Sequence, residues 1–155
     1  MLYLSLVLAT YGRSDLIGRF IEYLSVQTCK NFELIVVDQN SDDRVLPYIE
    51  QARCAGIAVS HYLMEKPNLS AARNLGIAHA TGDVIAFPDD DCWYEPDVIE
   101  QVLTTFSTRQ HWSGLVADWA PTNAENLKSF FSFISLRTHS LISFSKDLGD
   151  LTNRE

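Results

Sequence analysis

The chain has 155 residues, of which 46% are hydrophobic and 21% are charged, so it can bury a core without disulfides or a structural metal. This composition excludes collagenous, disordered and low-complexity proteins. A net charge of −8, with only short basic patches, argues against nucleic acid as a partner.

Apolar runs of strand length alternate with segments of helical periodicity, which predicts repeated βα units and a mostly parallel sheet flanked by helices. The run Phe32–Val37 is continuously apolar apart from one glutamate, as expected for a strand covered on both faces. Expected strands are Leu4–Ala9, Phe32–Val37, Ile57–Leu63, Val84–Phe87 and Leu115–Ala117. Expected helices are Ser14–Thr28, Asp43–Ala55, Ser70–Ala80, Glu95–Phe106 and Ala124–Ile134.

Local signals mark the ends of the predicted helices. Ser14 is expected to cap the first helix, because its hydroxyl can accept from a free backbone N–H group. Gly56 and Gly82 are expected to end the second and third helices. Pro96 lies near the first turn of the fourth, where its missing N–H costs nothing.

The cysteines and the apolar segments indicate in which cellular compartment the protein is found. Cys29, Cys54 and Cys92 are odd in number and widely spaced, so the sequence encodes neither a disulfide framework nor a zinc site. Leu2–Ala9 lacks the basic start and cleavage site of a signal peptide, and no segment reaches the roughly 18 apolar residues of a membrane span. We expect a cytoplasmic location.

Polar residues follow three of the predicted strands, at Thr10–Arg13, Asp38–Ser41 and Asp89–Asp91. Ligands of open α/β sheets bind beyond the carboxyl ends of strands, so these segments are candidates for one site. A carboxylate pair there offers the hard oxygen ligands that Mg²⁺ or Mn²⁺ prefers. The simpler alternative for the three aspartates is a solvated turn. A calcium loop fails, because Tyr94 occupies the position that requires glycine.

Other phosphate and nucleophile motifs are absent from the sequence. No Gly-x-Gly-x-x-Gly follows the first strand, and no Gly-Lys-Ser/Thr loop occurs, which excludes a dinucleotide site and a Walker-type loop. No Gly-x-Ser-x-Gly occurs either, which excludes a hydrolase nucleophile elbow.

Three segments together resemble the inverting glycosyltransferases of family 2, which have the GT-A fold. They are ATYGR at Ala9–Arg13, VVDQNSDD at Val36–Asp43, and SAARNLGIAHATGDVIAFPDDD at Ser70–Asp91. The resemblance covers roughly the first 105 residues. It implies one GT-A domain over residues 1–155, with a donor-binding part at 1–106 and a partial acceptor-side part at 107–155.

The resemblance also implies roles for single residues. Asp89 and Asp91 would be the outer members of an Asp-x-Asp motif that binds Mn²⁺ or Mg²⁺, with Asp90 in the variable middle position. The other residues implied in binding the nucleotide sugar are Thr10, Tyr11 and Arg13 in the pocket, Asp38 at the base, and Arg73 and Asn74 alongside.

Each of these residues also has a structural alternative. Tyr11 can be a packed aromatic, Arg73 can pair with a carboxylate such as Glu65, Asp38 can form an Asx turn, and Asn74 can be an ordinary surface residue.

The implied activity is transfer of a sugar from a nucleotide-diphosphate sugar, with UDP as the first choice of nucleotide, to a glycan or lipid-linked acceptor with inversion. The family's general base, typically in a Glu-Asp pair, is not identifiable after Asp91. We therefore expect an incomplete acceptor half, and the alternatives are a non-catalytic nucleotide-sugar-binding module or an inactive gene fragment.

Two further expectations concern the aromatic C-terminal part. Peripheral contact with the inner face of the membrane through Ser129–Phe144 is an alternative to burial, although Arg137 is the only Lys or Arg residue in this segment. If an acceptor subdomain normally covers the aromatic residues of this part, the chain exposes an apolar patch and self-associates. Those residues are Trp112, Trp119, Phe130, Phe131 and Phe133.

Overall fold

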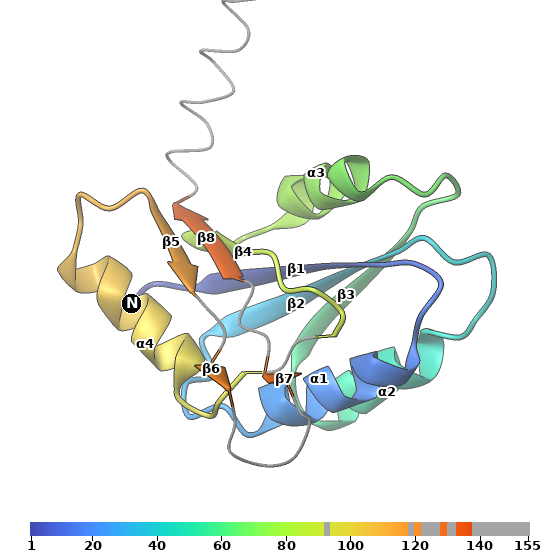
Figure 1. Cartoon of the computed structure of the whole chain (residues 1–155), viewed down its shortest axis with the longest axis horizontal. Coiled ribbons are helices and arrows are strands. Elements are labelled where there is room, and N and C mark those ends of the chain that lie inside the picture. Colours follow the sequence, from blue (N-terminus) through green and yellow to red (C-terminus); the bar gives the residue numbers. More distant parts are fainter. Residues whose placement is uncertain (92–93, 118–119, 122–127, 130–132, 138–155) are drawn as a thin grey trace, which may run out of the picture.

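The computed structural model describes residues 1–91, 94–117, 120–121, 128–129 and 133–137. Within them, six strands form one sheet in the order β3-β2-β1-β4-β8-β5, with helices on both faces (Figure 1). The strands are β1 (Leu4–Thr10), β2 (Phe32–Asp38), β3 (Ala58–Leu63), β4 (Val84–Ala86), β5 (Gly114–Ala117) and β8 (Phe133–Arg137). The helices are α1 (Asp15–Ser25), α2 (Leu46–Cys54), α3 (Leu69–His79) and α4 (Val98–Thr108).

Pairing in the sheet is parallel from β3 to β4 and antiparallel beyond it. β1 pairs with β2 and β4, and β2 pairs with β3, all in parallel. β8 pairs antiparallel with both β4 and β5. A short separate ladder joins β6 (Ala120–Pro121) to β7 (Lys128–Ser129). The prediction of an α/β fold with a mostly parallel sheet is confirmed.

Alternation along the central strands explains why the sheet has helices on both faces. Successive side chains of a strand point to opposite faces. In β1, Leu6 and Leu8 belong to one core and Val7 to another. In β2, Leu34 and Ile35 divide in the same way. Both strands are therefore apolar at nearly every position.

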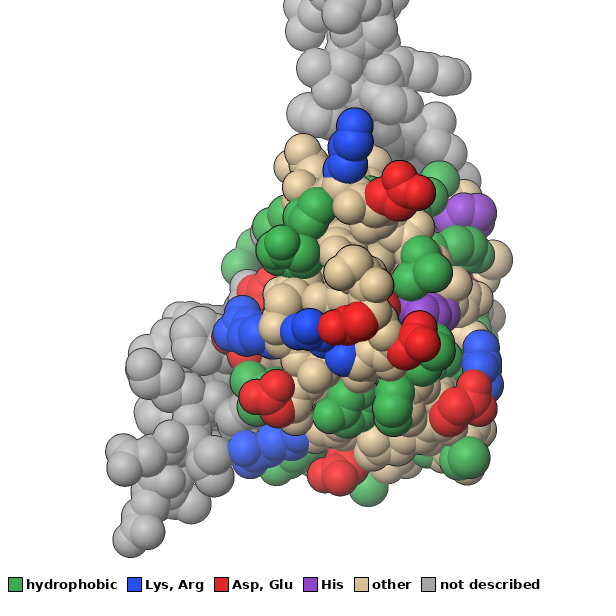
Figure 2. All heavy atoms as spheres, turned by 90° about the vertical axis from the view of Figure 1, so that its right-hand side faces the viewer, with side chains coloured by type: hydrophobic (Ala, Val, Ile, Leu, Met, Phe, Trp, Pro, Cys, Tyr) green, Lys and Arg blue, Asp and Glu red, His purple; other side chains and the backbone are tan. Residues whose placement is uncertain are grey.

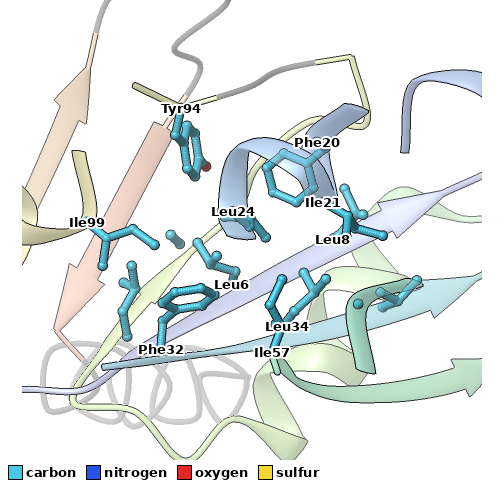
Figure 3. Close-up of a cluster of buried hydrophobic side chains, with 14 of the residues drawn as sticks. Leu6, Leu8, Phe20, Ile21, Leu24, Phe32, Leu34, Ile57, Tyr94 and Ile99 are labelled. Atoms are coloured by element: carbon cyan, nitrogen blue, oxygen red, sulfur yellow. The ribbon is translucent and has the colours of Figure 1, made fainter. Parts of the chain in front are cut away.

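The larger core lies between the sheet and helices α1, α2 and α4 (Figures 1 and 3). Phe20 of α1 meets Tyr94 edge to face, with ring centroids 5.6 Å apart. Burying a side chain of this size contributes on the order of 1.5–3 kcal/mol. This cluster anchors the chain segment that follows Asp91, because Tyr94 is fully buried in it.

The smaller core lies under α3, on the opposite face (Figure 1). Ala72 and Gly76 are the buried positions of this helix. Gly76 packs directly on Val7, so closely that a Cβ atom there would overlap the valine side chain. α3 therefore sits tightly over β1 and brings its N-terminus to the carboxyl edge of the sheet.

Most helix boundaries differ from the prediction by a few residues, for local reasons. α1 ends at Ser25 rather than Thr28, because Gln27 donates a side-chain bond to Glu95 O at 2.8 Å and Thr28 N donates to Pro96 O at 2.7 Å. Ser14 occupies the N-cap of α1, but its side chain makes no capping bond.

The remaining boundaries follow the same logic. α2 begins at Leu46 rather than Asp43, with Pro47 in its first turn, where no N–H is needed. α3 begins at Leu69 because the Asn68 side chain accepts from Ala71 N at 2.9 Å. α4 begins at Val98 rather than Glu95. Gly56 ends α2 with φ +76, as expected.

Two predictions about the fold are wrong. Gly82 does not end α3, which stops at His79. A Cβ at Gly82 would lie 2.7 Å from Ser5 N, so this glycine permits close approach to β1. The helix expected over Ala124–Ile134 is absent from its described part, since Lys128–Ser129 and Phe133–Arg137 are strands. Pairing of Lys128–Ser129 with β6, and of Phe133–Arg137 with β4 and β5, outweighs the local pattern there.

No helix in the described ranges is long and apolar enough to cross a bilayer. Most of Ser129–Phe144, for which membrane contact is the alternative to burial, lies outside the described residues, as do Trp119, Phe130 and Phe131. Trp112 is half-buried.

Candidate functional site

The carboxyl ends of the parallel strands form one edge of the sheet, and a cavity of about 520 Å³ opens there. Thr10 at the end of β1 pairs in register with Asp38 at the end of β2, and Gln39 N donates to Thr10 O at 3.0 Å. Figure 2 looks onto this side of the molecule, where acidic and basic side chains lie next to one another. The cavity is lined by Ala9, Tyr11, Arg13, Gln39, Pro67, Asn68, Leu69, Asp89, Asp90 and Asp91.

Arg13 and the aspartates at 90 and 91 form the charged centre of this cavity. Arg13 Nη2 lies 3.2 Å from Asp90 Oδ1, and Arg13 Nη1 lies 3.5 Å from Asp91 Oδ2. Thr10 Oγ1 lies 3.2 Å from both Asp90 Oδ2 and Arg13 O, and its one proton can serve only one of them at a time. The end of β1 is thereby joined to the segment after β4.

The three aspartates differ in exposure. The Asp90 side chain is 11% exposed, whereas those of Asp89 and Asp91 are 45% and 42% exposed. Burial raises the pKa of Asp90, against the opposing effects of Arg13 and Thr10. All three aspartates line the cavity, and Asp90 is the least exposed of them.

Arg73 approaches the same group from α3. Its Nη2 lies 3.4 Å from Asp89 Oδ1, and its guanidinium carbon lies 5.6 Å from the centre of the Phe87 ring. The structure thus pairs Arg73 with the aspartate triplet rather than with Glu65. Asn74, the next residue, is exposed and does not line the cavity.

Asp38 lies behind the cavity rather than in it. It is 1% exposed, and its Oδ1 accepts from Asn40 N at 2.9 Å and from Asn40 Nδ2 at 2.7 Å. Its Oδ2 lies 3.2 Å from His61 Nε2. The Asx-turn alternative therefore describes its geometry, and both oxygens are engaged within the protein.

Sequence reasoning included Gln39 only as a member of the polar segment Asp38–Ser41, and it missed the rest of one cavity wall. Gln39, directly after β2, lines the cavity, and its Oε1 accepts from Asn68 N at 2.7 Å. Pro67 and Leu69 flank Asn68 on the same wall. The position of Gln39 one residue past a strand end was the available signal, and the cap at Asn68 was a second.

The carboxylate oxygens at this site suit a divalent cation that is also coordinated by a bound ligand. Magnesium-like ions are commonly held by one or two carboxylates together with substrate phosphates, and Asp89 and Asp91 are two such carboxylates. In the part of the chain that the structure describes, no group of three or more His, Cys, Asp or Glu side chains could hold a metal. The residues fit a shared site and not a closed protein cage.

Solved structures with a similar fold define the fold class. A mannosyltransferase from Pyrobaculum calidifontis, PcManGT, in complex with GDP-Man and Mn²⁺, superposes with a TM-score of 0.78 at 16% identity, over 92% of this chain and 46% of its own. TarS 1-349 of S. aureus in complex with UDP gives 0.69 at 22% identity, over 80% and 37%. The chain has the GT-A fold of these glycosyltransferases.

The sequence comparison gives the family. The sequence model described as glycosyl transferase family 2 matches residues 5–137, and the chain belongs to this family. EpsH of Bacillus subtilis is 38% identical over 101 residues, covering 65% of this chain and 29% of EpsH. The amylovoran biosynthesis glycosyltransferase AmsB of Erwinia amylovora is 35% identical over 103 residues, covering 64% and 34%. The chain spans about a third of the length of these relatives.

Proposed function

We propose that the chain binds a nucleoside-diphosphate sugar together with Mn²⁺ or Mg²⁺, as the donor-binding part of a glycosyltransferase. The observation that carries this proposal is the pair of cavity-lining carboxylates, Asp89 and Asp91, beside the guanidinium of Arg13. Relatives in fold were solved with UDP, with UDP-GlcNAc, and with GDP-Man and Mn²⁺, which supports this class of ligand.

In this proposal the cavity-lining residues, together with the neighbouring Arg73, bind different parts of the donor. Asp89 and Asp91 would hold the cation, which neutralises charge on the departing diphosphate. Arg13 and Arg73 present guanidinium groups suited to bidentate contact with phosphate oxygens. Tyr11, 59% exposed, offers a ring face to the base or the sugar.

We assign the polar contact with the base to Gln39 rather than to Asp38, because Gln39 lines the cavity and Asp38 does not. The Gln39 amide accepts from Asn68 N at 2.7 Å and donates to Thr10 O at 3.4 Å. A side-chain amide has two N–H groups and two oxygen lone pairs, so one of each is left to pair with the edge of uracil. UDP remains our first choice of nucleotide.

The reaction we propose is a single displacement at the anomeric carbon. The acceptor oxygen forms the new bond as the bond to the diphosphate breaks, which inverts the configuration, and a general base takes the hydroxyl proton.

AmsB is named for amylovoran biosynthesis, which supports a glycan acceptor. Cys29 and Cys54 are free thiols, which supports a cytoplasmic location.

A donor-binding module without transferase activity is the second candidate. It is favoured by one observation: among the described residues, every carboxylate that lines the cavity belongs to the 89–91 triplet, which the donor and cation would occupy. Glycosylation of an acceptor by the purified chain with Mn²⁺ and UDP-sugars would decide for the enzyme.

Calorimetric titration of UDP with and without Mn²⁺ tests the shared premise. We expect Mn²⁺-dependent binding by the wild type, and loss of that binding in Asp91→Ala. Asp43→Ala, which removes an exposed carboxylate from the loop before α2, serves as the matched control and should bind normally. A folded wild-type chain that binds no UDP, or an Asp91→Ala variant that binds as the wild type does, would overturn the proposal.

A further inference from the structure

The turn that carries Arg13 is held by two side chains from the loop that follows β2. Gly12 N donates to Asn40 Oδ1 at 2.7 Å, and Arg44 Nη1 donates to Gly12 O at 2.9 Å. Gly12 has φ +77, a conformation that favours glycine. Asn40 and Arg44 thus bind both polar backbone atoms of the residue at the centre of the turn.

The buried Asp38 carboxylate fixes the orientation of Asn40. A carboxylate only accepts hydrogen bonds, so the side-chain nitrogen of Asn40 must face Asp38, where it donates to Oδ1 at 2.7 Å. The amide oxygen of Asn40 is then left to face Gly12. Asp38 itself is held from the other side by His61, with Nε2 3.2 Å from Oδ2.

Arg44 is oriented in the same manner by its own partner. Its Nε and Nη2 donate to the two oxygens of Asp42 at 2.7 and 2.6 Å, which leaves Nη1 for Gly12 O. This bidentate pair fixes the plane of the guanidinium. Each side chain that bonds to Gly12 is therefore oriented by a carboxylate: Asn40 by Asp38 at the end of β2, and Arg44 by Asp42 of the following loop.

The position of this turn decides where Arg13 reaches. Arg13 follows Gly12 directly, and its guanidinium lies 3.2 Å from Asp90 and 3.5 Å from Asp91. A rotation of the Gly12 peptide would move the guanidinium away from both carboxylates. Tyr11, on the other side of Gly12, also lines the cavity and would move with it.

We propose that Asn40 is a positioning residue of the donor site: it links the buried Asp38 carboxylate to the Gly12 amide and so holds Tyr11 and Arg13 at the cavity. Arg44 supports the same turn through the Gly12 carbonyl. The inference rests on the proposed function, because the turn matters for binding only if a donor occupies the cavity. It gives Asp38 an indirect role, through Asn40, in place of contact with the base.

The experiment combines a readout without ligand and one with ligand. Hydrogen exchange of the Gly12 amide, followed by NMR, reports the bond to Asn40 directly. Calorimetry of UDP with Mn²⁺ reports its effect on the donor site. Asn40→Ala is compared with Asn31→Ala, which removes the same side chain at the opposite end of β2, and Arg44→Ala is compared with Arg53→Ala, which breaks the ion pair with Glu50.

We expect Asn40→Ala to speed Gly12 exchange and to weaken UDP binding by about threefold to tenfold, the worth of one hydrogen bond. Arg44→Ala should weaken binding by a similar factor, and neither control should change either readout. Asn40→Asp should behave like Asn40→Ala, because it places a second carboxylate against Asp38. Combining it with Asp38→Asn should recover part of the affinity, since a donor again faces an acceptor.

Three outcomes would overturn the inference: unchanged Gly12 exchange in Asn40→Ala, unchanged UDP affinity despite faster exchange, or equal effects from Asn31→Ala. Absence of UDP binding by the folded wild type would instead remove the proposed function and the role in the donor site with it. Gly12 exchange would then still decide whether Asn40 holds the turn.

Discussion

The guanidinium of Arg13 lies 3.2 Å from the carboxylate of Asp90, across the edge of the sheet from the end of β1 to the segment after β4. The same guanidinium lies 3.5 Å from Asp91. Arg13 therefore already pairs with Asp91, one of the two carboxylates to which we assign the divalent ion, and it must share or yield Asp91 when that ion binds.

Replacing Arg13 should accordingly have opposite effects on the two ligands. We expect Arg13→Gln to raise the affinity for Mn²⁺ alone by about twofold to fivefold, because a competing cation at a half-exposed site is removed. UDP affinity in the presence of Mn²⁺ should fall, because a phosphate donor is lost. Electron paramagnetic resonance of free Mn²⁺ and calorimetry of UDP measure the two effects. Weaker binding of Mn²⁺ alone would contradict this prediction.

Two glycines with positive φ in the described part of the chain offer a matched pair. Gly12 has φ +77 and Gly56 has φ +76, and a Cβ atom at either would meet nothing within 4 Å. Each change to alanine should therefore cost about 1–2 kcal/mol in the free energy of unfolding, from backbone strain alone. Urea denaturation measures this cost. Only Gly12→Ala should also weaken UDP binding, and an equal loss of binding in Gly56→Ala would contradict that part.

Two glycines inside helices should respond differently to the same substitution. A Cβ at Gly76 would overlap the fully buried Val7, whereas a Cβ at Gly18 would lie 2.8 Å from the ring edge of the half-buried Tyr48, which can move. We expect Gly76→Ala to lower the free energy of unfolding by about 1–3 kcal/mol, as overpacking does, and more than Gly18→Ala does.

The partner of that overlap provides the control. Combining Gly76→Ala with Val7→Ala should be less destabilising than the sum of the two single changes, because the truncated valine makes room for the new methyl group. Denaturation midpoints of the four proteins in this cycle measure the coupling. Strict additivity would show that α3 does not pack on β1 through this contact.

Because of Asp90, we expect the free energy of unfolding to depend on pH when no divalent cation is present. Burial raises the pKa of Asp90, so the folded state favours the protonated form. The contribution of Asp90 to the free energy of unfolding is greatest below the pKa that it has in the unfolded chain. This contribution is lost as pH rises through the higher pKa of Asp90 in the folded protein. Asp90→Asn should therefore raise the free energy of unfolding at neutral pH and have little effect below about pH 4. A gain of equal size at both pH values would contradict this assignment.

The sequence predicted those parts of the fold that local pattern determines. The apolar run of β2 and the alternating strands and helices up to α4 required only periodicity. β8 did not follow from such a pattern, because its partners Val84–Ala86 and Gly114–Ala117 lie far away in the sequence. A short apolar segment of this kind suits a strand or a buried helix, and pairing decides between them.

The same division applies to the candidate site. Convergence of parallel strand ends was enough to bring Arg13 and the aspartate triplet together. Alternation alone could not determine which of Asp38 and Gln39 faces the cavity, because the chain leaves its regular strand geometry at this point. The wall around Asn68 depends on where α3 begins, which a side-chain cap sets to the residue.

β8 lies between β4 and β5 in the sheet, although it follows both of them in the sequence. It is therefore synthesised after both of its neighbours. During synthesis, the edge of β4 that pairs with β8 stays unpaired from the time β4 leaves the ribosome until the chain has been made as far as Arg137. At about 5–20 residues per second this interval is roughly 3–10 s. Open strand edges can pair with strands of other chains, so the nascent chain has an aggregation-prone edge during this interval. Arrival of the last described strand closes this gap in the sheet.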